Sequence, residues 1–278
     1  MTMGNRGWNA DYAYLRRVVL GRSRNVLHPA RDYLFEARLA RLVRKCGLND
    51  LRELVEHMRR TGDGELEAAV ADAMTVNETS FFRDLRPFEL LRKELLPALI
   101  AARHRTRMLR LWSAGCSTGQ EAYSVAMLIR EDFHSLQGWK VQVEGSDISN
   151  EVVERAKAGT YERLEVNRGL PARYLTRYFD RTVERWKVKP AIRAMCSFRQ
   201  MNLCEVPLPF HQRFDVILMR NVMLYFEPPV RRAVMAEARR LLAPDGVLFM
   251  GATEQPPEME MWKAEIVNGA CFFRPVKR

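Results

Sequence analysis

Residues 109–128 read LRLWSAGCSTGQEAYSVAML, and this stretch decides the fold of the chain. It begins with a short, largely apolar run that is typical of a buried strand. A turn of small residues follows from Ala114 to Gly119, and apolar residues then recur at steps of three and four, which is helical spacing. A strand, a glycine turn and a helix predict one unit of a doubly wound α/β domain, in which the N-terminus of the helix attracts anionic or polar ligands.

The glycine turn differs from two common nucleotide-binding loops. The dinucleotide fingerprint needs three glycines, whereas only Gly115 and Gly119 are present, and no Gly-Lys-Ser/Thr follows as in a phosphate-binding Walker loop. A looser turn followed by Glu121 suits a ligand with a ribose and an amino-acid moiety, such as S-adenosylmethionine. The alternative is a strand–helix turn whose glycines serve only packing.

A second carboxylate follows the next predicted strand. The segment 141–147 ends at Asp147, where dinucleotide-binding folds place the carboxylate that accepts both ribose hydroxyls. Ser149 is a good N-cap for the helix that begins at Asn150, so helix capping is the alternative role for Asp147. Given the glycine turn upstream, the sequence favours ribose binding.

Composition narrows the class of protein. The 278 residues carry a net charge of +11, which points to an acidic partner, unless the surplus of arginine reflects only a coding bias. Five widely spaced cysteines without a C-x-x-C pair predict a reduced, cytoplasmic protein with no metal site. No run of about 18 apolar residues occurs, and no secretory signal pattern opens the chain, so we expect no direct membrane insertion.

The order of patterns predicts three regions. Residues 1–75 read as an all-helical N-terminal domain, with residues 1–10 as a tail. A linker and helix occupy 76–104, and an α/β domain occupies 105–278. Within that domain we expect a small β insertion at about 178–200.

Further elements are expected in the helical and α/β regions. The predicted helix 30–46 carries a basic ridge of Arg38, Arg41 and Lys45, which is either a solvated surface or a docking strip. The insertion should hold strands at 186–188, 192–195 and 197–199. The strand 214–219 should place Arg220 and Asn221 at its carboxyl end, where ligands bind in open α/β sheets, and 270–273 should form a last, antiparallel edge strand.

Four motifs together are more specific than any one of them. In chain order they are NETSFFRD at 77–84, SAGCSTGQEAYSVAM at 113–127, SDIS at 146–149 followed by AGTY, and RNVMLYF at 220–226. In this order they resemble the chemotaxis receptor methyltransferases, the CheR family, over residues 12–275. One departure is Gln120-Glu121-Ala122-Tyr123, where the family more often has Glu-Glu-Pro-Tyr, but Glu121 keeps its place.

The resemblance implies a Rossmann-like S-adenosylmethionine-dependent methyltransferase that esterifies glutamates on the cytoplasmic helices of chemoreceptors and releases S-adenosylhomocysteine. Arg83 and Tyr225 would lie nearest the transferred methyl group, and the basic ridge would dock the substrate. The turn of the β insertion is short and lacks glycine, which favours receptor binding without a C-terminal pentapeptide. We also expect the protein to be a monomer. The cofactor pocket would be lined by Asn77, Thr79, Arg83, Gly115, Glu121, Asp147, Asn202, Leu203, Arg220 and Asn221.

Two other functions compete with this interpretation. A nucleic-acid methyltransferase would fit the basic charge, but RNVMLY stands where amino-group methylation of DNA uses an Asn/Asp-Pro-Pro-aromatic motif, and no Pro-Cys pair serves base-carbon methylation. We therefore expect no nucleic-acid partner. A signalling module that binds S-adenosylmethionine without turnover is the other, and the presence of both Arg83 and Tyr225 argues against it.

Overall fold

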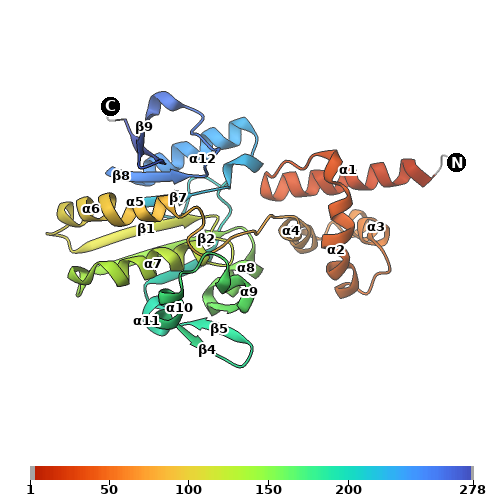
Figure 1. Ribbon diagram of the computed structural model, residues 1–278. Helices are drawn as coiled ribbons and strands as arrows, with labels where there is room; N and C mark the ends of the chain where they lie inside the picture. The colour runs from red at the N-terminus through yellow and green to blue at the C-terminus, as the bar shows by residue number, and fades with distance from the viewer. Residues whose placement is uncertain (1–3, 277–278) are drawn as a thin grey trace. The chain divides into compact units, whose positions relative to one another are not determined.

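The computed structural model of the chain describes residues 4–276. Contacts between Cα atoms divide the chain into two compact units. The first consists of Met1–Val76 and Tyr225–Val230, and the second of Asn77–Leu224 and Arg231–Arg278. Figure 1 colours both units along the chain, and each is described below by itself.

The first unit is a bundle of helices around one apolar core. Fully buried side chains from each long helix meet there, among them Leu15, Phe35, Leu54 and Val70. Asp63 caps the last helix through hydrogen bonds that its side chain accepts from two backbone N–H groups, an arrangement that typically contributes about 1 kcal/mol. The helices are α1 (Gly4–Ser23), η1 (Pro29–Arg31), α2 (Tyr33–Lys45), α3 (Leu51–Thr61) and α4 (Gly64–Ala73).

Helix α1 corrects the prediction of an N-terminal tail. The helix begins at Gly4, and residues 1–3 lie outside the part of the chain that the structure describes. The ring of Trp8 stacks on Tyr12 with centroids 5.7 Å apart, and Tyr12 stacks on the buried Phe35 of α2 at 6.1 Å. These aromatic contacts fix the early turns of the helix, and a tail assignment from local sequence could not include them.

The second unit contains a mixed, largely parallel sheet with the strand order β6-β2-β1-β7-β8-β10-β9. The strands from β6 to β8 are parallel, and β10 is antiparallel to both β8 and β9. The doubly wound α/β class predicted from the sequence is therefore confirmed. The strands are β1 (Met108–Ala114), β2 (Lys140–Asp147), β6 (Cys196–Gln200), β7 (Phe214–Met219), β8 (Leu242–Met250), β9 (Trp262–Val267) and β10 (Ala270–Pro275).

One face of this sheet packs against helices in a continuous apolar core. Leu111, Val143, Val216 and Phe249 are fully buried there together with apolar residues of the helices between Arg86 and Asp132. The sequence predicted β1 and β7 as apolar runs, and β7 is buried at every position, as is usual for a central parallel strand. The helices of the unit are α5 (Arg86–Leu90), η2 (Leu91–Leu95), α6 (Leu96–Ala102), α7 (Gln120–Asp132), η3 (His134–Leu136), α8 (Asn150–Ala158), α9 (Arg163–Asn167), α10 (Ala172–Tyr178), α11 (Pro190–Arg193), η4 (Met223–Tyr225), α12 (Pro228–Leu241) and η5 (Met259–Met261).

A second, small sheet has the order β3-β5-β4 and differs in part from the predicted insertion. Its strands are β3 (Thr160–Glu162), β4 (Phe179–Arg181) and β5 (Arg185–Val188). The predicted strand at 192–195 is wrong, because Pro190 starts the short helix α11 there. The segment 197–199 is a strand, but as part of β6 it pairs in parallel with β2 and so belongs to the main sheet.

The end of the chain carries a further correction. The predicted last strand exists as β10 and is antiparallel, but it is not the edge of the sheet, because β9 pairs with its outer side. Strand β9 has weak apolar alternation, and its Ile266 is 74% exposed. An exposed edge strand of this kind leaves little hydrophobic pattern to read in the sequence.

Candidate functional site

The glycine turn between β1 and α7 is shaped by close packing. Gly115 has a φ of +74°, and a Cβ atom there would lie 2.4 Å from Cγ2 of Val222. Gly119 has a φ of +92°, and a Cβ atom there would lie 2.9 Å from Cβ of Ala156. Both positions therefore exclude a side chain, and the turn brings the N-terminus of α7 to the carboxyl edge of the sheet.

Asp147 joins the turns that follow β1 and β2. Its Oδ2 accepts a hydrogen bond of 2.8 Å from the backbone N–H of Ser117, and its Oδ1 accepts one of 3.1 Å from that of Ser149. The N-cap of α8 is Ser149, whose Oγ accepts from the N–H of Val152. Asp147, at 8% exposure, therefore links two loops rather than capping the helix itself.

Arg220 is the centre of a buried ion cluster at the carboxyl end of β7. Its Nη1 donates to Oε2 of Glu121 at 2.9 Å, and its Nη2 donates to Oδ2 of Asp84 at 2.6 Å and to the carbonyl of Arg83 at 2.9 Å. Oε1 of Glu121 in turn accepts from the hydroxyl of Ser113 at 2.7 Å. Only 3% of the Arg220 side chain is exposed, so this arginine fastens the 77–84 segment to the sheet.

The segment 77–84 adopts an unusual backbone. Phe82 and Asp84 have positive φ angles of 49° and 57°, a region that costs energy for residues other than glycine. The carbonyl of Asn77 accepts a hydrogen bond of 2.8 Å from the Oγ of Ser117. Nη1 of Arg83 donates to the carbonyl of Glu78 at 3.0 Å, which folds the segment back on itself. Thr79 lies between these anchors and is half-buried.

Asn202 and Leu203 lie in the loop after β6. The N–H of Met201 donates to the carbonyl of Asp147 at 2.8 Å, which holds this loop beside the end of β2. The side chain of Asn202 is engaged locally, because its Oδ1 accepts from the N–H of Cys204 and its Nδ2 donates to Glu205. Leu203 is buried. The loop thus reaches the same edge of the sheet as the glycine turn.

Glu254 belongs to this edge but was missed in the sequence. Its carboxylate accepts hydrogen bonds from the backbone N–H groups of Asn221 at 2.6 Å, Gly251 at 2.8 Å and Leu224 at 3.1 Å. Asn221 has a positive φ of 60°, and Glu254 is only 9% exposed. Its position just after β8, the next parallel strand, was the available signal, but no local pattern marks the amide groups it binds.

The three predicted substrate-docking residues and Tyr225 belong to the first unit. Nη1 of Arg38 donates to the carbonyls of Met74 and Thr75 at 3.0 and 2.9 Å, just after α4 ends. Arg41 and Lys45 are exposed on α2. The carbonyl of Tyr225, at the end of η4, accepts a hydrogen bond of 2.9 Å from the N–H of Val26.

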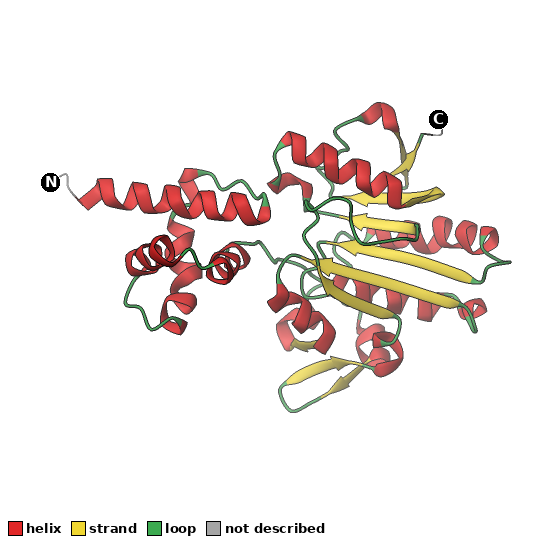
Figure 2. Cartoon of the chain, turned by 180° about the vertical axis from the view of Figure 1, so that it is seen from behind, coloured by secondary structure: helices red, strands yellow, loops and turns green. Residues whose placement is uncertain are grey.

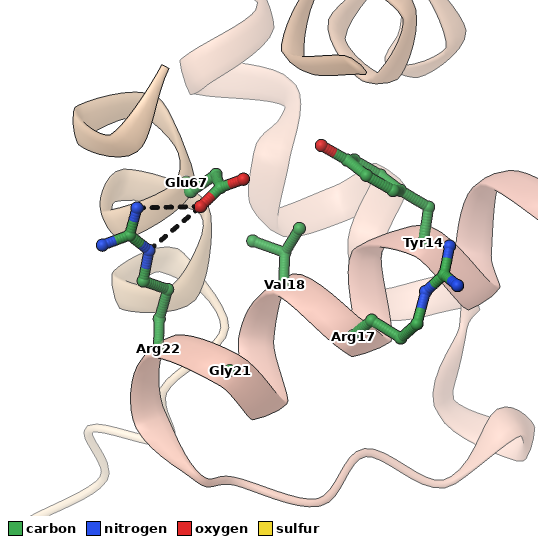
Figure 3. Close-up of a pocket in the computed structure, with 6 residues that line it drawn as sticks. All are labelled: Tyr14, Arg17, Val18, Gly21, Arg22 and Glu67. Carbon is green, nitrogen blue, oxygen red and sulfur yellow. Dashed lines mark hydrogen bonds and ion pairs between the residues drawn. The ribbon is translucent and has the colours of Figure 1, made fainter. Parts of the chain in front are cut away.

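A cleft of about 440 Å³ opens on the first unit between α1 and α4 (Figure 3). Arg22 and Glu67 form one side through hydrogen bonds from Nε and Nη2 to Oε2 of the carboxylate. Tyr14 and Arg17 flank the other side. None of the predicted ridge residues lines this cleft, so the ridge on α2 and the cleft are separate features of the unit.

Cys116 lies in the glycine turn, but its thiol is not suited to act as a nucleophile. Burial, together with the Asp147 and Glu121 carboxylates, raises the pKa of its thiol well above the ordinary value, so the thiol stays neutral at physiological pH. Between residues 4 and 276, no group of three or more His, Cys, Asp or Glu side chains is arranged to hold a metal ion. In the same part of the chain no helix is long and apolar enough to cross a membrane.

The polar groups at this edge fit S-adenosylmethionine. Asp147 holds its carboxylate at the carboxyl edge beside the glycine turn, and a carboxylate is an acceptor of the kind that binds ribose hydroxyls. Nε of Arg220 is buried without a hydrogen-bond partner among the described residues, and buried donors of this kind are normally satisfied by a partner atom. An oxygen of a bound ligand would supply that partner.

Comparisons with known proteins identify the family of the chain. Residues 77–269 match the family described as "CheR methyltransferase, SAM binding domain", and residues 10–75 match "CheR methyltransferase, all-alpha domain". The chain is 41% identical to chemotaxis protein methyltransferase 1 of Pseudomonas aeruginosa and 38% identical to chemotaxis protein methyltransferase Cher2 of Pseudomonas putida. Both alignments cover 88% of this chain and 90% of the relative.

One solved structure to which this chain is similar has a lower sequence identity. The glycopeptide N-methyltransferase MtfA in complex with S-adenosylmethionine is 12% identical, with a TM-score of 0.37 over 63% of this chain and 51% of that one, and this likeness supports no structural detail. The two family matches are contiguous along the chain and contain all four motifs together with the carboxyl-edge cluster. The chain therefore belongs to the CheR methyltransferase family and is an S-adenosylmethionine-dependent protein-glutamate methyltransferase.

Proposed function

We propose that this enzyme methylates glutamate side chains on the cytoplasmic helices of chemoreceptors, forming glutamyl methyl esters and S-adenosylhomocysteine. The observation that supports this most is the Arg220 cluster, which ties Glu121 and the 83–84 segment to the carboxyl edge beside the glycine turn. The relatives named above are chemotaxis methyltransferases, so chemoreceptors are the substrate class that follows for this chain.

We assign the cofactor pocket to the carboxyl edge of the sheet. Asp147 would accept the ribose hydroxyls, Glu121 would face the methionyl end, and the loop with Asn202 and Leu203 would lie on the adenine side. Gly115 would allow the backbone to approach the cofactor. The remaining pocket residues are Asn77, Thr79, Arg83, Arg220 and Asn221.

The reaction needs alignment more than proton transfer. A free glutamate has a pKa of about 4.3, so the attacking carboxylate is already ionised at neutral pH and requires no general base. The bound cofactor supplies an electrophilic methyl group on a sulfonium cation. Because the attacking anion and the cation neutralise each other, a dry site favours the reaction. The main task of the protein is in-line alignment, which can supply several kcal/mol.

Arg83 and Tyr225 are the residues that we place nearest the reacting atoms. The rigid, planar guanidinium of Arg83 suits a carboxylate, and its hydrogen bond to the carbonyl of Glu78 limits its rotation. We infer that Arg83 orients the substrate or the cofactor and takes no part in proton transfer. Tyr225 would lie beside the transferred methyl group.

We propose that Arg41 and Lys45 lead substrate docking on α2, because both are exposed. Arg38 belongs to the same ridge but also binds the carbonyls of Met74 and Thr75, so its contribution would be partly structural. Receptor methylation helices are typically rich in glutamate, and a basic surface raises the rate of encounter with such helices.

The remaining proposals concern organisation. Residues 1–75 would act as the docking domain, 76–104 as a connecting segment, and 105–278 as the catalytic domain with its β insertion at about 178–200. The loop of residues 182–184 between β4 and β5 is short, which supports receptor recognition without a C-terminal pentapeptide. We further propose a cytoplasmic monomer.

Incubation of the purified enzyme with methyl-labelled S-adenosylmethionine and receptor-bearing membranes from its own source tests this function. We expect label on receptor-sized bands that is released by mild base, because glutamyl methyl esters are base-labile. Base-stable label would contradict the glutamate assignment. Tight product binding without any transfer would instead favour a sensor of the cofactor.

A further inference from the structure

The face of the main sheet opposite the apolar core is partly bare. Figure 2 views the sheet from this side and shows long strands with no helix in front of them, while α12 covers the neighbouring part. The residues of this bare part are polar: Arg110 pairs in register with Gln142, and the next residue of β2 on this face is Glu144. Residues 201–213, which connect β6 to β7, form a loop on this side of the sheet. In many parallel sheets such a connection is a helix that covers the face of the sheet.

This bare part contains a cavity of about 250 Å³ with a basic lining. The lining includes three basic side chains, those of Arg110, Lys140 and Arg199. It also includes one carboxylate, that of Glu144. Nη2 of Arg199 lies 3.2 Å from Oε2 of Glu144, and its guanidinium lies 4.9 Å above the ring of Phe210. One carboxylate thus neutralises one arginine and leaves two cations.

The other two cations have unused hydrogen-bond donors. The side chain of Arg110 donates through Nε to Oε1 of Gln142 at 3.3 Å, and no further partner of its guanidinium is found among the described residues. Lys140 is exposed at the start of β2, and within residues 4–276 its Nζ contacts no carboxylate. A guanidinium and an ammonium with free donors on adjacent strands attract carboxylates or phosphates.

Arg110 and Lys140 lie away from the methyl-transfer edge, whereas Arg199 pairs in register with Ser146, the residue before Asp147. Arg110 precedes the glycine turn at Gly115 along an extended strand, which separates them by roughly 16 Å at about 3.3 Å per residue. An anion bound here is therefore not the carboxylate that receives the methyl group. The cavity is also shallow and smaller than the 300–1,000 Å³ or so of small-molecule sites, but it can hold the side chains of a protein segment.

We propose that this basic face of the sheet, formed by Arg110, Lys140 and Arg199, docks a carboxylate-rich segment of a partner protein. Charge complementarity identifies the occupant: two unneutralised cations and the donor groups of Gln142 suit two neighbouring acidic side chains. The docking face is independent of the receptor ridge on α2 and of the cofactor pocket. It gives the enzyme a second, charge-selective contact with an acidic protein.

Fluorescence anisotropy with the full-length enzyme tests this proposal. The probe is a short, fluorescein-labelled peptide in which glutamate alternates with serine. The combined variant Arg110→Gln/Lys140→Gln/Arg199→Gln should weaken binding by at least about tenfold, and wild-type binding should weaken as salt rises. The matched control is Lys93→Gln/Arg130→Gln/Arg163→Gln, which removes the same charge from exposed positions of the same unit and should change binding less than about twofold.

The affinity for S-adenosylhomocysteine should be unchanged in both combined variants, which verifies their fold. If the first variant does not fold, Lys140→Gln alone should still weaken peptide binding several-fold, because this side chain is exposed and forms no salt bridge with the residues that the structure describes. Equal losses in the two combined variants would reduce the effect to net charge and overturn the proposal. Tighter binding of inorganic phosphate or a nucleoside triphosphate than of the peptide would overturn the assignment to an acidic protein segment.

Discussion

Arg220 shows how one side chain can assemble a site from distant parts of the sequence. Its guanidinium contacts Glu121 of α7 and both Arg83 and Asp84 of the polar segment, although it lies on a third element, the end of β7. Glu121 is the buried partner of this arginine, and removing one member of a buried pair typically costs about 3–5 kcal/mol, because the other charge is left uncompensated. Lysine would not replace this arginine, since it lacks the fork that reaches two carboxylates.

At the scale of single residues, the orienting role of Arg83 gives the first prediction. Arg83→Ala should lower turnover by roughly 100-fold through loss of alignment, with no new ionisation in the pH–rate profile between about pH 6 and pH 9. Arg86→Ala is the control, because Arg86 is an exposed arginine close by in the sequence and should leave turnover unchanged. A new ionisation in the profile of the Arg83 variant would show that this arginine takes part in proton transfer.

Glu254 gives a second prediction at this scale. Its carboxylate accepts hydrogen bonds from three backbone N–H groups and so holds the loops after β7 and β8 together. Glu254→Ala should therefore lower the free energy of unfolding by about 1–3 kcal/mol. The affinity for S-adenosylhomocysteine should fall as well, and Glu254→Gln should restore part of it. Calorimetric titration and urea unfolding measure both effects, with the exposed Glu260→Gln as the control. Unchanged product affinity in Glu254→Ala would separate this carboxylate from the cofactor pocket.

At the scale of secondary-structure elements, helix α2 combines two roles on one basic ridge. Carbonyl groups at the end of a helix need hydrogen-bond donors from outside the helix, and Arg38 supplies them just after α4. The side chains of Arg41 and Lys45 are exposed to solvent. A substitution at Arg38 therefore changes stability and surface charge together. The docking hypothesis has to be tested on the other two residues.

Reversing both exposed charges, in Arg41→Glu/Lys45→Glu, should raise KM for receptor several-fold and leave cofactor affinity unchanged. The loss of steering should be greatest at low salt and should shrink as salt rises. Steady-state methylation at several salt concentrations measures this, with Arg31→Glu/Arg60→Glu as the control of equal charge, since both of these residues are exposed in the same unit. Equal KM values for the two variants would reduce the ridge to an ordinary solvated surface.

Sequence patterns predicted the elements that depend on local order. Strand β1, the glycine turn and α7 follow from the residues themselves, and Asp147 follows from its place after β2. Long-range pairing decided the rest. Nothing near residues 197–199 indicates that this strand joins β2 rather than the insertion, and nothing near Glu254 indicates the amide groups that it binds.

At the scale of the whole molecule, several carboxylates contribute to acid sensitivity. Hydrogen bonds from arginines lower the pKa values of Glu131, Glu237 and Asp245 below their ordinary range. A lowered pKa gives stability that is present above the unfolded-state value of about 4 and is lost as the pH falls through the folded-state value. Asp215 acts in the opposite direction, because burial raises its pKa and its protonation is easier in the folded state.

Glu237 isolates this effect experimentally. Its carboxylate accepts from Arg240 and from the backbone N–H of Leu208, so Glu237→Gln should lower the thermal unfolding midpoint at pH 7 by a few degrees. The difference from wild type should shrink below about pH 4, because the wild-type carboxylate then becomes protonated as well. Calorimetric scans from pH 7 to about pH 3.5 measure this, with Glu260→Gln as a control that should follow wild type. A difference that does not vary with pH would assign the loss to packing.

The contact between Gly115 and Val222 has a consequence for how sequences of this family can diverge. A Cβ atom at position 115 would overlap the side chain of Val222, about a hundred positions further along the chain, and the φ of +74° would strain any other residue there even beside a smaller neighbour. The motifs at 113–127 and 220–226, which look like separate cofactor-binding motifs in the sequence, are thus in direct steric contact. We therefore expect substitution of Gly115 to be poorly tolerated even when residue 222 is made smaller.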